Sequence, residues 1–215
     1  MKNMQKQNGF TLIEIAIVLV IIGLLLGGVM KGQELINSAK VKNLAADFRN
    51  IPVLIYGYQD KYKRLPGDDN SAKARFGATT VDGNGDGIID GSWNSPVSTE
   101  NLDVESVRFW QHVRLANLSA GSTDFTSIAT ASLPTNAEGG RVGIQMSAPI
   151  LGMSGSYYIC SQNIPFKLAQ QLDTTLDDGN GATGTMRAQA GSTTDSAKSG
   201  VAYADGNSYT VCLAF

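Results

Sequence analysis

The chain has 215 residues, of which 42% are hydrophobic, and it carries 17 Lys and Arg against 19 Asp and Glu. This length supports one compact domain with an appendage and argues against a second full domain. The slightly negative net charge lacks the basic footprint of a dedicated nucleic-acid binder, so nucleic acid is not an expected partner.

The N-terminus combines a short basic leader with a long apolar run. Residues 1–9 carry two lysines and no acid, whereas residues 10–30 contain a single ionisable side chain, Glu14. As a helix the apolar run would be about 30 Å long, which is enough to cross a bilayer. The positive-inside rule then leaves the leader in the cytoplasm and exports the rest of the chain, residues 31–215.

Glu14 places a carboxylate inside this apolar segment. Such a charge costs roughly 2.5 to 3.5 kcal/mol on insertion scales, so it needs a partner or a function. One interpretation is that the side chain lies near the helix end and reaches back to the lipid headgroups. The other is that the carboxylate has a specific partner or task.

The six residues from Gly9 to Glu14 (GFTLIE) resemble the processing motif of type IV prepilins and of type II secretion pseudopilins. The resemblance implies that a prepilin peptidase cuts after Gly9 and methylates the new N-terminus, Phe10. It also implies that Glu14 pairs with the Phe10 ammonium of a neighbouring subunit. Docking the two charges would remove two desolvation penalties together and fix the axial register. The implied product is a homo-oligomeric filament, built by assembly machinery in the inner membrane.

Beyond Met30 the helical pattern continues but becomes amphipathic. Apolar residues recur at intervals of three and four as far as Tyr62, which predicts a helix that packs one face on a head domain. Pro52 lies within this pattern and predicts a bend or a local break, because proline lacks an N–H and crowds the preceding turn. The turn at residues 65–68 (LPGD) then ends the helix.

Residues 82–90 (DGNGDGIID) place oxygen-bearing side chains at positions 1, 3, 5 and 9 of an EF-hand-like loop, with glycine at position 6. Hard oxygen ligands at this spacing predict a structural Ca2+, bound by Asp82, Asn84, Asp86, the Ile88 carbonyl and Asp90. Position 12 is Trp93 instead of glutamate, so a more distant acid would complete the shell, the candidates being Glu100, Asp103 and Glu105. The alternative is a metal-free turn cluster of Asn, Asp and Gly.

The remaining segments predict short helices, strands and loops. Helical periodicity is found at residues 104–118, as an amphipathic helix, and at residues 164–172. Strands are expected at residues 141–146, 156–161, 183–189 and 209–215. The acidic turn at residues 177–181 is interpreted as a hairpin connection. The expected fold class is α+β and similar to type IV pilins, with a long N-terminal helix, half transmembrane and half amphipathic, on a small antiparallel sheet.

Cys160 and Cys212 stand far apart and belong to no C-x-x-C pair, which argues against zinc and against a thioredoxin-like redox motif. In an exported protein one disulfide is their simplest use, and two free thiols are the alternative. The disulfide would close a loop of about 50 residues and add about 3 to 4 kcal/mol of stability.

No sequence motif indicates a set of catalytic residues. The single histidine, His112, lies on an expected helix, and no nucleophile elbow, metalloprotease pair, Walker loop or Rossmann glycine run occurs. The expected function is therefore a structural subunit of a type IV pilus-like filament, and not an enzyme. The alternatives are a pseudopilin of type II secretion and, from another class, a membrane-tethered binding or hydrolytic protein. The precursor is expected to be a single-pass inner-membrane protein that later joins an extracellular or periplasm-spanning filament.

Overall fold

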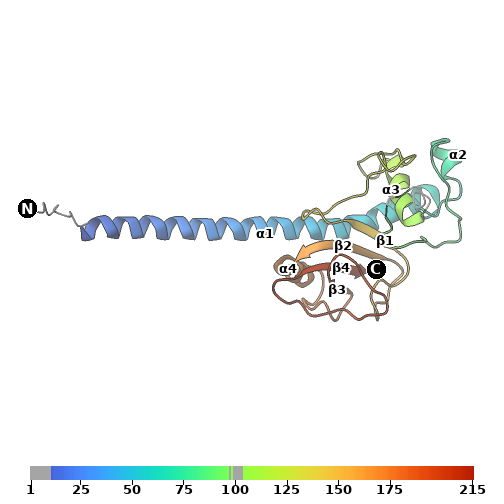
Figure 1. Ribbon diagram of the computed structural model, residues 1–215. Helices are drawn as coiled ribbons and strands as arrows, with labels where there is room; N and C mark the ends of the chain where they lie inside the picture. The colour runs from blue at the N-terminus through green and yellow to red at the C-terminus, as the bar shows by residue number, and fades with distance from the viewer. Residues whose placement is uncertain (1–10, 97, 99–103) are drawn as a thin grey trace, which may run out of the picture. The chain divides into compact units, whose positions relative to one another are not determined.

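The structure, a computed structural model, describes residues 11–96, 98 and 104–215. Its elements in chain order are α1 (Leu12–Tyr62), α2 (Ala72–Phe76), α3 (Glu105–Leu115), β1 (Val142–Gln145), β2 (Tyr158–Pro165), α4 (Phe166–Leu176), β3 (Met186–Ala190) and β4 (Ser208–Ala214) (Figure 1). The long apolar N-terminal helix and the antiparallel four-stranded sheet confirm the predicted α+β class. The chain divides into two compact units, Met1–Ala39 and Lys40–Phe215.

The described part of the first unit is the N-terminal portion of α1. Its large apolar side chains are all exposed, from Leu12 at 93% to Met30 at 74% and Ile36 at 52%. Among the residues that the structure describes, α1 is the one helix long and apolar enough to cross a membrane. Apolar surface of this extent needs lipid or other apolar helices around it, because water solvates it poorly.

The portion of α1 in the second unit buries one face. The buried side chains recur at intervals of three and four and are Val41, Leu44, Phe48, Ile51, Ile55 and Tyr58. The helix continues through Pro52, so the predicted local break does not occur. A proline costs about 3 kcal/mol in a helix interior, whereas burying an isoleucine or phenylalanine contributes about 1.5 to 3 kcal/mol each. Packing of the flanking turns therefore holds the helix together to Tyr62, after which Lys63 adopts a left-handed conformation (φ 56°).

The sheet has the order β1-β2-β4-β3, and all neighbours are antiparallel. The four predicted strands and both predicted helices of the head are present, with ends shifted by a few residues. The interpretation of residues 177–181 as a hairpin connection is wrong, because they join α4 to β3. The helical pattern from residue 164 extends to Leu176, so the chain enters this turn from a helix and not from a strand.

Both outer strands of the sheet are covered. At the outer edge of β1 the Val142 N–H donates to the Pro134 carbonyl (3.1 Å). A Cβ added at Gly143 would lie 2.0 Å from the Trp93 carbonyl oxygen, so the backbone at Trp93 lies against one face of this strand. On β3, Ala188 hydrogen-bonds through its backbone to Gly181 and Val201. Covered edges leave little room for another strand to join the sheet.

Helix α3 is buried on every side from Glu105 to Arg114, although its sequence predicted a helix with one apolar and one polar face. The polar side chains bind carbonyl groups of two flanking segments, residues 79–82 and 122–132; they are Arg108, Gln111, His112 and Arg114. Buried polar groups are stable when they are hydrogen-bonded in this way. The helix thus serves as a central support for the loops of the head.

Candidate functional site

The prepilin-like motif begins outside the described residues, which include neither Gly9 nor Phe10. At the start of α1, the Glu14 carboxylate accepts hydrogen bonds through one oxygen, Oε2, from the Thr11 N–H (2.8 Å) and the Thr11 hydroxyl (2.7 Å). The Glu14 N–H donates in return to the Thr11 hydroxyl oxygen (3.3 Å). This reciprocal arrangement is a capping box, which satisfies N–H groups at the first turn of a helix.

Three of the predicted calcium ligands converge in the loop at residues 82–90. The Asn84 amide nitrogen lies 3.2 Å from a carboxylate oxygen of Asp86 and 3.2 Å from one of Asp90. The Asn84 side-chain oxygen accepts the Asp86 N–H (2.9 Å), and the other Asp86 oxygen accepts the Ile88 N–H (2.9 Å). The loop therefore directs two carboxylates and one amide toward a common point, where the amide nitrogen now meets both acids.

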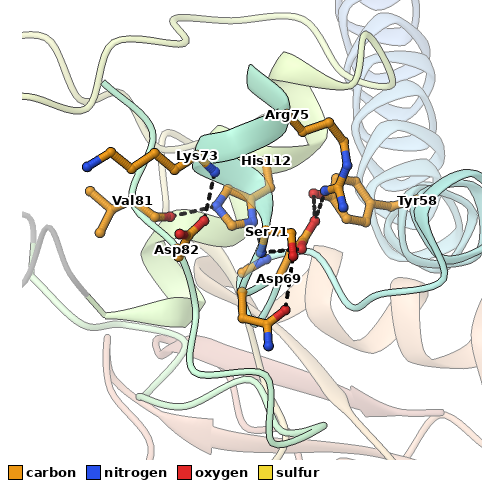
Figure 2. Close-up of polar contacts among 10 residues, drawn as sticks. Tyr58, Asp69, Ser71, Lys73, Arg75, Val81, Asp82 and His112 are labelled. Carbon is orange, nitrogen blue, oxygen red and sulfur yellow. Dashed lines mark hydrogen bonds and ion pairs between the residues drawn. The ribbon is translucent and has the colours of Figure 1, made fainter. Parts of the chain in front are cut away.

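Asp82 also contacts a neighbouring helix. Its carboxylate accepts the Lys73 N–H (2.7 Å) and so satisfies a donor in the first turn of α2 (Figure 2). Within the described part of the chain, Asp82, Asp86 and Asp90 do not form a group with their oxygens within 4.8 Å of one another. One Asp82 oxygen thus caps α2, and the prediction that all three acids share one ion stays a prediction.

Asp68 organises the same loop, although the sequence indicated only a helix-ending turn at this position. Its carboxylate is 4% exposed and accepts the N–H groups of Gly85 (2.6 Å), Asp86 (3.1 Å) and Gly87 (2.8 Å). Successive N–H groups that point inward form a concave site for an anion. The one sequence signal was indirect: a glycine-rich turn of this length needs an acceptor for its backbone donors.

Glu105 holds the two ends of the loop. One carboxylate oxygen accepts the Asn84 N–H (2.8 Å) and the other accepts the Asp90 N–H (2.9 Å). Burial raises the pKa of Glu105, and the two N–H donors partly offset this effect. Of the three acids considered for completing the metal shell, Glu105 is at the loop, whereas Glu100 and Asp103 lie outside the described residues.

A pocket of about 350 Å³ opens beside this loop. Its polar lining comes from Asp82, Asn84, Asp90, Glu105 and Arg108. The carboxylates outnumber the guanidinium, so the pocket favours a cation over an anion.

Trp93, at position 12 of the loop, is a buried residue of the core. Its side chain is 1% exposed and lies in a cluster with the disulfide between Cys160 and Cys212, which the structure contains as predicted. The Trp93 N–H donates to the Gln145 side-chain oxygen (2.9 Å), and its indole N–H donates to the Thr194 hydroxyl (2.9 Å). Trp93, which replaces the glutamate of an EF-hand at this position, therefore anchors the loop to the sheet.

A second acidic group that the sequence did not predict lies at the end of α4. The carboxylate oxygens of Asp173, Asp177 and Asp178 lie within 4.8 Å of one another and could hold a metal ion. Asp173 already accepts the Tyr203 hydroxyl (2.7 Å) and the Gly179 N–H (2.9 Å), and burial raises its pKa.

His112 lies at the centre of the contacts in Figure 2. Its side chain is fully buried, and both ring nitrogens bind backbone groups. The Gly67 N–H donates to Nδ1 (3.0 Å), so Nδ1 carries no proton, and Nε2–H donates to the Val81 carbonyl (3.0 Å). Burial lowers the pKa of His112 below its ordinary value. With both nitrogens occupied by backbone, the imidazole acts as a structural connector.

Beside this imidazole, a buried carboxylate ties α2 to α1. Asp69 accepts the Tyr58 hydroxyl (2.6 Å) and the Ser71 N–H (2.9 Å), and it forms an ion pair with Arg75 (Figure 2). A buried charge is stable when it is paired and hydrogen-bonded. The segment from Tyr62 to α2 is therefore fixed by side chains that come from both of its ends.

The family model for the prokaryotic N-terminal methylation motif matches residues 4–30. No curated protein and no solved structure matches the chain. The motif implies processing by prepilin peptidase and assembly into pilus-like filaments, and it points to a structural protein. Together with the exposed apolar portion of α1, this match supports a type IV pilin-like or pseudopilin subunit in general.

Proposed function

We propose that the chain is a structural subunit of a type IV pilus-like extracellular filament. Residues 1–9 form a leader that prepilin peptidase removes, residues 10–30 anchor the precursor in the inner membrane and later bundle in the filament, and residues 31–215 continue α1 and form the head. The observation that carries this proposal is the methylation motif at residues 4–30, which runs into a helix whose apolar side chains are exposed. Such a helix can exchange lipid for equivalent helices of other subunits.

The capping box supports a further role for Glu14. Among the described residues, hydrogen bonds reach only one oxygen of its carboxylate, Oε2. The other oxygen, Oε1, is available to the methylated Phe10 ammonium of a neighbouring subunit. Capping of its own helix and pairing with a neighbour are therefore compatible in one side chain.

The test is mass spectrometry of the exported protein. We expect the mature chain to begin at Phe10 with one added methyl group, and Gly9→Val to accumulate in the membrane with the leader attached, because a branched side chain replaces glycine at the cleaved bond. A mature chain that begins at Met1, or at any residue other than Phe10, would overturn the proposal. Electron microscopy of sheared cells then distinguishes a surface filament from the short filament of a secretion pseudopilin.

We also propose a structural Ca2+ in the loop at residues 82–90. The ligands would be Asn84, Asp86 and Asp90, whose side chains meet in the loop, together with the Ile88 carbonyl, while one oxygen of Asp82 caps α2. The donor set fits, because these are hard oxygen ligands beside an acidic pocket. A bound cation would neutralise the repulsion between Asp86 and Asp90.

A further inference from the structure

We propose that His112 is an acid-sensitive latch, which holds the turn at residues 65–68 and the segment at residues 79–82 against α3 only while its imidazole is neutral. The two hydrogen bonds to the Gly67 N–H and the Val81 carbonyl carry this inference, because they require a single tautomer. A backbone N–H can only donate, so Nδ1 must accept. The proton of the neutral ring is then fixed on Nε2.

Protonation would replace the acceptor at Nδ1 by a second donor. The Nδ1–H and the Gly67 N–H would then face each other at about 3.0 Å, in a site where the imidazole has no exposed surface. Two opposed donors cannot share a hydrogen bond, and an unsatisfied buried donor is costly. The protonated ring therefore has to break its contact with Gly67.

The charged groups around the ring do not relieve this conflict. Asp69, in the turn after α1, is already bonded to Tyr58 and Arg75, and Asp82 caps α2 through Lys73. Arg108, on α3 itself, opposes a second positive charge. The Tyr58 ring of α1 stacks at 6.2 Å between centroids. Burial outweighs the attraction of the two acids, and the pKa of His112 is lowered.

The latch would act on the loop at residues 82–90 through Asp68, the residue that follows Gly67. Gly67 has a φ of +93°, and a Cβ there would lie 2.5 Å from the Glu105 carbonyl oxygen, so the turn is pressed against the first turn of α3. Asp68 follows directly and binds three N–H groups of the loop at residues 82–90. Release of Gly67 by acid would therefore loosen the anchor of that loop.

The test compares the unfolding equilibrium of the wild-type full chain with that of the variant His112→Gln. Both proteins are in detergent micelles with excess chelator, and the pH is varied from about 7.5 to about 5. Glutamine offers an oxygen acceptor and an N–H donor and does not titrate. Because the folded pKa is lowered, the unfolded state takes up the proton first as the pH falls below about 6.5. We expect the unfolding equilibrium constant of the wild-type protein to rise up to tenfold per pH unit relative to the variant, until the folded pKa is reached.

Nuclear magnetic resonance on the wild-type protein decides the matter even if the variant does not fold. We expect the imidazole 15N shifts to show an unprotonated Nδ1 well below pH 6.5, and hydrogen exchange at the Gly67 amide to accelerate as the ring takes up its proton. Equal pH profiles for the two proteins, or a ring that titrates at its ordinary pKa with unchanged Gly67 exchange, would overturn the proposal.

Discussion

Asp68 shows how one carboxylate organises a loop that lies 17 to 19 residues further along the chain. Its oxygens accept the N–H groups of Gly85, Asp86 and Gly87, and the Asp86 N–H is shared with the Asn84 side-chain oxygen. The negative charge strengthens each bond, since hydrogen bonds to charged groups are about twice as strong as neutral ones. Local sequence could not predict this role, because backbone donors carry no residue-type signature.

Replacing Asp68 by asparagine tests this arrangement at the scale of one atom. Asparagine keeps the shape, but its NH2 group would face at least one of the backbone donors, and the charge is lost. We expect a loss of about 2 to 3 kcal/mol in the free energy of unfolding, measured by urea denaturation of the full chain in micelles with chelator present. Asp60→Asn is the matched control, because Asp60 is exposed and, in the part of the chain that the structure describes, forms an ion pair on the surface with Lys63. Equal stability of the two variants would contradict the assigned role.

At the scale of elements, sequence periodicity predicted α3 but not its surroundings. The alternation of polar and apolar residues indicated a solvated face, whereas the structure covers that face with residues 79–82 and 122–132. The partners of Gln111 and Arg114 there are backbone carbonyls, which every residue type provides. A polar side chain that binds solvent and one that binds a buried carbonyl look the same in the sequence.

The acidic loop was predicted from spacing, and its convergence at Asn84, Asp86 and Asp90 is local and therefore visible in the sequence. The placement of Asp82 and the contributions of Asp68 and Glu105 depend on tertiary contacts of the loop with α2, with the turn after α1 and with α3. Spacing alone could not reveal them. The metal itself stays a prediction, which a thermal melt can test.

We expect Ca2+ to raise the melting temperature of the full chain over that in chelator, and Mg2+ to do so less, because Mg2+ demands stricter octahedral geometry. At a concentration about 100 times Kd the gain is about 2.7 kcal/mol. Asp86→Asn combined with Asp90→Asn should abolish the shift, and Asp178→Asn, in the second acidic group, should leave it unchanged. A shift that only Asp178→Asn removes would place the ion at that group, and no shift at all would reject the site.

At the scale of the whole molecule, the two portions of α1 are suited to different surroundings. Up to Met30 the side chains of α1 other than Glu14 are apolar and exposed, and from Val41 the apolar side chains form a stripe that joins the core of the head. Composition and period both change along this helix, so the sequence predicted the two portions well. The strands and the disulfide were also predictable, because the residue pattern of a strand and the number of cysteines can be read directly from the sequence. The pairing order β1-β2-β4-β3 could not be predicted, because it depends on long-range packing.

The assembly role of Glu14 belongs to this scale, and two substitutions separate it from helix capping. Glu14→Gln keeps the capping box, since glutamine also serves at this position, but it removes the charge. Glu14→Ala removes both. If the carboxylate pairs with the Phe10 ammonium of a neighbour, both variants should reach the membrane at normal levels and both should assemble poorly. Breaking a buried ion pair costs about 3 to 5 kcal/mol, which is more than a hundredfold in the association constant of each contact.

The measurement is the yield of sheared filaments, normalised to the amount of subunit in the membrane fraction. Thr11→Val is the complementary control, because it removes the hydroxyl that binds Glu14 and leaves the charge in place. We expect this variant to assemble far better than Glu14→Gln. If Glu14→Gln instead assembles normally and Thr11→Val and Glu14→Ala both fail, capping alone accounts for the acid, and the helix register in the filament must be set by other contacts.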